Sequence, residues 1–349
     1  MGRSFTDSGG SPGVFSECDS DRSGELSSTG SPVAGVASGG RGGSAALHRL
    51  FFSRAADNAE ELIHALVADL ESPSASIELK RKAAMELRLV AKYNPENRLR
   101  IAHAGGVRPL VALMSSSDPI LLENGVTAIL NLSLCDENKD LIAAAGAIKP
   151  LVRALSSDTP AARENAACAL LRLSQTEEQK IAIGQSGAIP HLVDLLQTGR
   201  PRGKKDASTA LYSLCSTKEN KIRALQAGIV RPLLDLMADP DSGMVDKAAY
   251  VLFALVGVAE GREATVEEDG IPVLVEMVEV GTQRQKEISA ATLLLICEDS
   301  VPCRSMVARE GAIPPLVALS QSGSSLAKEK AETLIQLLRL PRVAPPAGK

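Results

Sequence analysis

The sequence predicts an all-α fold, an elongated stack of helical repeats that follows a disordered N-terminal tail. Two observations lead to this prediction. One short phrase returns along the chain at a nearly constant spacing, and the 349 residues are 44% apolar but only 2% aromatic, with no Trp. Stacked helices can be filled by Leu, Ile, Val and Ala, whereas a compact core of this size normally contains more large rings.

The recurring phrase defines the repeat. It reads A-G-G-V-R-P-L-V-A-L at 104–113, A-G-A-I-K-P-L-V-R-A-L at 145–155 and S-G-A-I-P-H-L-V-D-L-L at 186–196. Its anchoring glycines are spaced by 41, 41, 41, 42 and 41 residues, at Gly105, Gly146, Gly187, Gly228, Gly270 and Gly311. A period near 41 is typical of the helical armadillo and HEAT repeats.

The helix and turn signals within one repeat distinguish the armadillo class from the HEAT class. A short helix opens near Glu177, Gly187 is suited to the left-handed turn that closes it, and Pro190 fits the first turn of a second helix. The pairs Asp118-Pro119 and Thr159-Pro160 each place a capping side chain before a Pro at the start of a third helix. Three helices make an armadillo unit and two make a HEAT unit, so we predict an armadillo-repeat right-handed superhelical solenoid.

The organisation along the chain follows from this register. Residues 1–45 are rich in Ser and Gly and predict a disordered tail. A junction at 46–57 precedes an array at 58–341, and residues 342–349 form a C-terminal tail. The array divides into a truncated opening repeat at 58–94 and six repeats at 95–135, 136–176, 177–217, 218–259, 260–298 and 299–341.

Several phrases of the array resemble the armadillo region of plant U-box proteins. They read E-N-G-V-T-A-I-L-N-L-S-L-C-D-E-N-K from 123, E-N-A-A-C-A-L-L-R-L-S-Q from 164, K-K-D-A-S-T-A-L-Y-S-L-C-S-T-K-E-N-K from 204 and G-T-Q-R-Q-K-E-I-S-A-A-T-L-L from 281. The resemblance covers roughly residues 58–341. It implies an array that binds ubiquitination substrates or receptor-type kinases, while a separate U-box recruits a ubiquitin-conjugating enzyme.

The U-box half of that architecture is not visible in the sequence. Residues 1–57 lack its apolar pattern, and the nearest match, L-M-A-D-P at 236–240, is explained as a helix end followed by a turn. We therefore expect a non-catalytic protein-interaction scaffold connected with ubiquitination or kinase signalling. The alternative is the substrate-recognition part of a ubiquitin ligase.

The third helices of armadillo arrays line a concave groove, and the glycine register aligns their side chains in rows. Polar groups on adjacent third helices suggest a surface that bonds to the backbone and acidic groups of an extended peptide. The predicted partner-binding residues are Asn124, Asn131, Asn165, Arg172, Lys205 and Tyr250. The alternatives are solvated helix faces and, for Tyr250, packing between repeats.

Other functions find little support in the sequence. A nuclear-signal receptor of this fold needs a row of Trp, which is absent, and a net charge of -4 without a clustered basic footprint argues against nucleic acid. Four scattered histidines and the missing phosphate loop predict no catalytic residue, metal or cofactor. We expect protein or extended-peptide partners, a monomer, no membrane insertion, and a reducing compartment, cytoplasm or nucleus.

The tail offers candidate phosphorylation sites. Ser11-Pro12 and Ser31-Pro32 fit proline-directed phosphorylation, and Ser16 and Ser20 lie beside the carboxylates of Glu17, Asp19 and Asp21. Phosphate added there increases the negative charge of the tail and can change its docking onto the array. The alternative is that these Ser-Pro pairs are ordinary features of a disordered tail.

Overall fold

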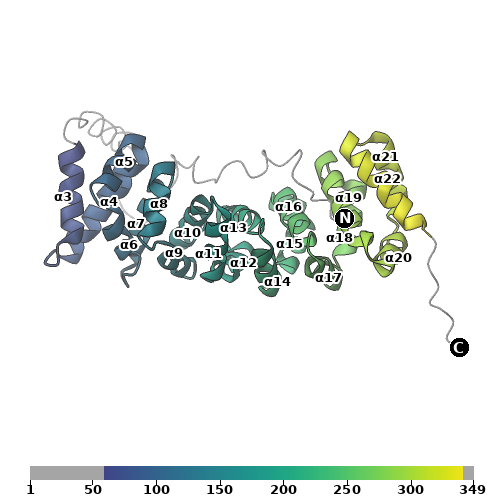
Figure 1. Ribbon diagram of the computed structural model, residues 1–349, viewed down its shortest axis with the longest axis horizontal. Coiled ribbons are helices and arrows are strands. Elements are labelled where there is room, and N and C mark those ends of the chain that lie inside the picture. The colour runs from purple at the N-terminus through teal and green to yellow at the C-terminus, as the bar shows by residue number, and fades with distance from the viewer. Residues whose placement is uncertain (1–58, 341–349) are drawn as a thin grey trace, which may run out of the picture. The chain divides into compact units, whose positions relative to one another are not determined.

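The computed structural model describes residues 59–340, and most of them are helical (Figure 1). They form two compact units, which we call the N-terminal unit (residues 59–175) and the C-terminal unit (residues 176–340). The predicted tail, the junction and the C-terminal tail lie outside the described residues. None of the helices between 59 and 340 is long and apolar enough to cross a membrane.

The N-terminal unit begins with two helices, α3 (Ala59–Glu71) and α4 (Ile77–Tyr93). Two sets of three helices follow. The first comprises α5 (Pro95–His103), α6 (Val107–Leu113) and α7 (Pro119–Leu132), and the second α8 (Asp136–Ala144), α9 (Ile148–Leu155) and α10 (Pro160–Leu173).

The C-terminal unit contains four more sets. They are α11 (Glu177–Gln185), α12 (Ala188–Thr198) and α13 (Pro201–Leu214); α14 (Lys218–Gln226), α15 (Val230–Met237) and α16 (Val245–Val256); α17 (Ala259–Glu267), α18 (Gly270–Val280) and α19 (Gln283–Glu298); and α20 (Val301–Arg309), α21 (Ile313–Ser322) and α22 (Ser325–Arg339). A short 3-10 turn, Pro240–Ser242, joins α15 to α16.

Within each unit, successive sets pack against one another through their long third helices. In the N-terminal unit α4 contacts α7 and α7 contacts α10; in the C-terminal unit α13, α16, α19 and α22 pack in the same sequence. Small residues allow this close approach, since Ala166, Ala167, Cys168 and Ala169 of α10 are all completely buried. The three-helix unit and the aliphatic core confirm the predicted armadillo fold class.

The turn between the first and second helix of a set requires a left-handed residue. Glycine occupies it with a positive φ of 73–86° in five sets, at Gly105, Gly146, Gly187, Gly228 and Gly311. The remaining set differs from the prediction. Its left-handed residue is Asp269 (φ 57°), and Gly270, which we aligned with the other glycines, is instead the first residue of α18.

At Gly270 a side chain is excluded by close neighbours and not by a left-handed backbone. A Cβ built there would lie 2.6 Å from the Thr265 methyl and 2.7 Å from the Thr265 carbonyl oxygen. Measured between left-handed residues, the 42-residue interval lies one repeat later, because Gly228 and Asp269 are 41 apart and Asp269 and Gly311 are 42 apart.

The predicted caps of the third helices are correct at one position and wrong at the other. The Asp118 carboxylate accepts hydrogen bonds from the backbone N–H groups of Ile120 and Leu121 at 3.0 and 2.9 Å. Thr159 precedes α10 in an extended conformation, but its side chain makes no capping hydrogen bond. Pro160, with its fixed φ and missing N–H, nevertheless begins that helix.

Candidate functional site: the third-helix faces

The predicted asparagines of the N-terminal unit lie on α7 and α10, and their side chains connect neighbouring third helices. The Nη1 of Arg88, on α4, donates to the Oδ1 of Asn124 at 2.9 Å. The Nδ2 of Asn131 donates to the backbone oxygen of Arg88 at 3.0 Å. On the next pair of helices, the Nδ2 of Asn165 donates to the Oγ1 of Thr127 at 2.9 Å.

Burial shows what these amides do for the fold. Asn124, Asn131 and Asn165 are only 5%, 9% and 7% exposed. A buried polar group without a partner is costly, so each bond stabilises the contact between adjacent third helices. The amides are therefore not solvated surface groups, and peptide binding at these positions stays a prediction.

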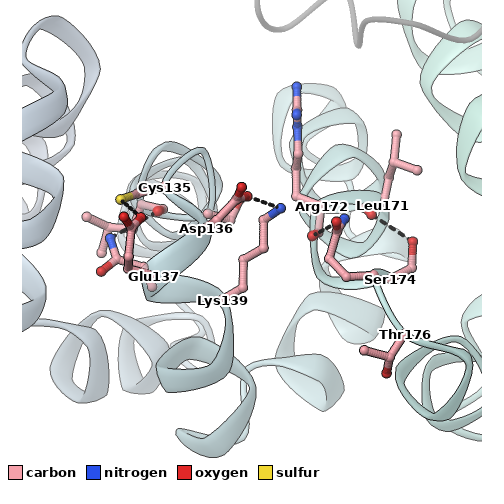
Figure 2. A network of polar contacts seen from close by, with 12 residues as sticks. Cys135, Asp136, Glu137, Lys139, Leu171, Arg172, Ser174 and Thr176 are labelled. Atoms are coloured by element: carbon pink, nitrogen blue, oxygen red, sulfur yellow. Dashed lines mark hydrogen bonds and ion pairs between the residues drawn. The ribbon is translucent and has the colours of Figure 1, made fainter.

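Arg172 lies near the end of α10 and is half-buried. Across from it, on α8, Lys139 forms an ion pair with Asp136, with 2.5 Å between Nζ and Oδ1. Figure 2 shows the Arg172 side chain running away from this pair. The pKa of Asp136 is held below its usual value, first by the hydrogen bond and charge of Lys139 and to a smaller extent by the charge of Arg172.

In the C-terminal unit, Lys205 lies on α13 and Tyr250 on α16, and both are half-buried. A short series of bonds connects the two helices around them. The Lys247 Nζ donates to the Thr209 Oγ1 at 3.1 Å, and that hydroxyl donates to the backbone oxygen of Lys205 at 2.8 Å. On the other side, the Gln285 amide of α19 donates to Asp246 of α16 at 2.7 Å.

Tyr250 lies beside a cation that the sequence did not point to. The guanidinium carbon of Arg284, on α19, is 5.9 Å from the centroid of the Tyr250 ring, within the range of a cation–π contact. Burial raises the pKa of Tyr250, and the nearby Arg284 charge partly offsets this effect. The phenol therefore stays neutral at physiological pH and can donate a hydrogen bond.

The structure thus places the six predicted residues in two local groups, one in each unit. Arg88 and Arg284 contact predicted residues and were missed by the sequence reasoning. No other repeat carries an Arg in the register row of Arg88, and the row of Arg284 contains one other, Arg202, two repeats earlier, so periodicity offered little signal for them. Among residues 59–340 there is also no group of three His, Cys, Asp or Glu side chains able to hold a metal ion.

Comparison with known proteins identifies similar sequences and folds. A family model described as the plant U-box protein ARM repeat region matches residues 63–342. The chain is 64% identical over 259 residues to U-box domain-containing protein 12 of Oryza sativa subsp. japonica, covering 74% of this chain and 42% of that one. It is 65% identical over 263 residues to U-box domain-containing protein 14 of Arabidopsis thaliana, with 75% and 42% covered.

The chain therefore spans less than half the length of these relatives. Among solved structures, a designed armadillo repeat protein in complex with the peptide (KR)4 superposes with a TM-score of 0.58 at 23% identity, covering 67% of this chain and 99% of that one. At this level of identity the likeness concerns the fold alone.

Proposed function

The chain belongs to the plant U-box protein ARM repeat region family, and on this basis we propose that it is a non-catalytic scaffold that binds partner proteins along its third helices. The observation that supports this most directly is the row of polar side chains held in place on adjacent, mutually packed helices. Stacked repeats present an extended surface that can contact a peptide at many points.

The mutual hydrogen bonds of the third helices favour this function energetically. Because Asn124, Asn131 and Asn165 are held by neighbouring helices, their side chains lose little conformational freedom when a ligand is bound. A preorganised row can bind an extended segment through bonds to its backbone, while half-buried cations such as Arg172 and Lys205 select acidic side chains. We infer partners among ubiquitination substrates and receptor-type kinases.

The test uses the full chain as bait in plant lysate, beside the Asn131→Ala/Arg172→Ala variant. We expect specific partners to bind the native chain and to be lost with the variant. Since Asn131 donates to the Arg88 carbonyl, the variant is first compared with the native chain by thermal unfolding. The single variant Arg172→Ala, which keeps that bond and is compared by thermal unfolding in the same way, separates binding from stability.

A matched control changes an arginine away from the third helices. Arg231, on α15, is 62% exposed and forms an ion pair with Asp235 on the same helix. Arg231→Ala should retain every partner that Arg172→Ala loses. Equal capture by the native chain and the Asn131→Ala/Arg172→Ala variant would show that partners bind elsewhere.

A second function, the substrate-recognition part of a ubiquitin ligase, is supported by the U-box domain-containing relatives. In that case the array selects a protein and a U-box supplies the conjugating enzyme. The same capture experiment distinguishes the two. A ubiquitin-conjugating enzyme bound equally by the native chain and the Asn131→Ala/Arg172→Ala variant favours the ligase function through a surface outside the third helices.

A further inference from the structure

The C-terminal unit concentrates the aromatic residues of the described chain on two adjacent third helices. Residues 59–340 contain four Tyr or Phe side chains, and three of them, Tyr212, Tyr250 and Phe253, lie on α13 and α16. All three are half-buried rather than enclosed. In a core filled by aliphatic side chains, this concentration marks a place where a flat apolar group can pack against the surface.

Basic residues are frequent on the same third helices and on the next one, α19. The third-helix segments 200–213, 244–254 and 282–295 together contain seven Lys or Arg and three Asp or Glu, although the whole chain carries a net charge of -4. We call Tyr212, Tyr250 and Phe253, together with Lys205, Lys247 and Arg284, the aromatic–basic face. Its charge is opposite in sign to that of the molecule as a whole.

The three carboxylates within these segments are already engaged. Asp206 is 1% exposed and pairs with Arg202, 3.6 Å from its Nε, while Asp246 accepts a hydrogen bond from Gln285. Glu287 accepts a hydrogen bond from the Ser324 hydroxyl. With seven cations against three carboxylates, these segments carry a net positive charge, which presents a positive potential to an approaching anionic segment.

The chain itself contains a segment of matching chemistry. Four carboxylates occur within nine residues, at Glu17, Asp19, Asp21 and Glu25, with Arg22 as the only opposing charge, and Phe15 lies two residues before the first of them. No other part of residues 1–58 combines an aromatic side chain with several acids. Phe15 supplies the flat apolar group and the carboxylates supply the negative charge.

We propose that residues 15–25 of the N-terminal tail bind the aromatic–basic face of the C-terminal unit and compete there with partner proteins. Phe15 packs against Tyr250 and Phe253, and the carboxylates pair with Lys205, Lys247 and Arg284. The inference rests on the proposed function, since the tail acts as an internal competitor only if third helices bind partners. Phosphates on Ser16 and Ser20 add charge to this segment and tighten the contact.

The test measures binding of a fluorescein-labelled peptide of residues 12–27 by fluorescence anisotropy. Two full-length receptors are compared: the native chain and a tail variant carrying Phe15→Ala, Glu17→Gln, Asp19→Asn, Asp21→Asn and Glu25→Gln. A tethered segment competes at an effective concentration in the millimolar range, so we expect the peptide to bind the native chain at least about tenfold more weakly than the tail variant.

Substitutions on the face locate the binding. Adding Tyr250→Ala and Arg284→Ala to the tail variant should weaken peptide binding at least about tenfold, whereas adding Arg231→Ala should leave it unchanged. Because Tyr250 is half-buried, a second variant with Lys205→Glu and Lys247→Glu repeats the test without removing a ring. A peptide with phosphoserine at 16 and 20 should bind the tail variant more tightly than the unmodified one.

Several results would overturn the inference. Equal affinity for the native chain and the tail variant would show that the tail does not occupy the face. Peptide binding that survives both sets of face substitutions would place the binding site elsewhere, and unchanged affinity of the phosphopeptide would remove the regulatory part.

The inference and the proposed function can fail separately. If the peptide does not bind but Arg172→Ala still loses partners, the tail inference fails and the proposed function stands. If the native chain captures no partner and the tail variant does, both are supported.

Discussion

Five glycines and one aspartate occupy equivalent left-handed positions in the repeats, and this comparison shows what a single residue contributes. A Cβ built at Gly187 would meet no atom within 4 Å, so any cost of a side chain there is conformational and not steric. For an L-residue the left-handed conformation costs roughly 1–2 kcal/mol, and Asp tolerates it better than most because its short side chain bonds locally. Asp269 is accordingly the one described non-glycine residue with a positive φ.

This difference leads to a prediction on stability. Gly187→Ala should lower the free energy of unfolding by about 1 kcal/mol, measured by urea denaturation followed by circular dichroism. Asp269→Gly relieves strain but increases the entropy of the unfolded chain, so it should not lower stability by a comparable amount. Equal losses in the two variants would contradict the conformational explanation.

Individual residues also show which features could be predicted from the sequence and which could not. Glycine spacing predicted five of the six left-handed turns, and it missed Asp269 because Gly270 offered a more familiar residue one position later. The register correctly placed Asn131 on a third helix. Its bond to the Arg88 carbonyl, 43 residues away, depends on how two helices pack, which periodicity within one repeat does not specify.

At the scale of helices, another pair of asparagines connects successive first helices. The Nδ2 of Asn220, at the third position of α14, donates to the Lys180 carbonyl at 2.8 Å and the Leu214 carbonyl at 3.0 Å, and the residue is fully buried. Asn138 bonds in the same way to Arg98 and Leu132 at 3.1 Å. Each amide thus joins a first helix to the previous repeat and to the preceding third helix.

Asn220→Ala should therefore be clearly destabilising. It leaves two buried carbonyl oxygens without this donor, a loss of about 1–3 kcal/mol, measured from the urea midpoint. The control is Gln179→Ala, at the same position of the preceding repeat, where the side chain completes a capping box with Thr176. That loss should be smaller, at about 1 kcal/mol or less. If the Gln179 variant were the less stable of the two, the amide connection between repeats would contribute less to stability than the capping box.

The cap of α7 gives a pH-dependent prediction. The pKa of Asp118 is held below its usual 3.8, first by the hydrogen bond from Arg81 and then by the backbone N–H groups of Leu121 and Ile120. A lowered folded-state pKa contributes stability above pH 3.8, and this contribution is lost as the pH falls through the folded value. Protonation therefore weakens the beginning of the helix.

Asp118→Asn retains a capping oxygen but removes the charge. Its melting temperature should be lower than that of the native chain at pH 7, and the difference should shrink below pH 4, as followed by circular dichroism. Arg81→Gln should show the same convergence, since it removes the partner that lowers the pKa of Asp118. A difference that is constant from pH 7 to pH 3 would exclude an ionic contribution.

At the scale of the whole molecule, the cysteines report on both units. Burial raises the pKa of Cys215 and of Cys297 to about 12, from an ordinary 9.0. Near pH 8 such a shift lowers the reactive thiolate fraction by roughly a thousandfold. Cys168 is fully buried in the N-terminal unit, whereas Cys303 is only partly buried.

Iodoacetamide labelling of the native chain at pH 8 should therefore modify Cys303 long before Cys168, Cys215 or Cys297. Mass spectrometry of the digested protein assigns each site. The three buried thiols should react only when urea unfolds the unit that contains them. Rapid labelling of Cys215 or Cys297 without denaturant would show that the helices around it open under native conditions.

The left-handed turn has a consequence for recombining the chain. This turn lies between the first and second helix of a repeat, and its open surroundings leave room to join segments from two different proteins there. Its position is defined by backbone geometry, and from Gly105 to Asp269 it recurs at a constant interval of 41 residues. Repeats exchanged between family members at this residue would keep each second helix attached to its own third helix. A chimera cut at Gly270, following the glycine pattern alone, would instead delete or duplicate one residue of the turn. The folding of such chimeras therefore tests which residues of two repeats are equivalent more strictly than an alignment of their sequences does.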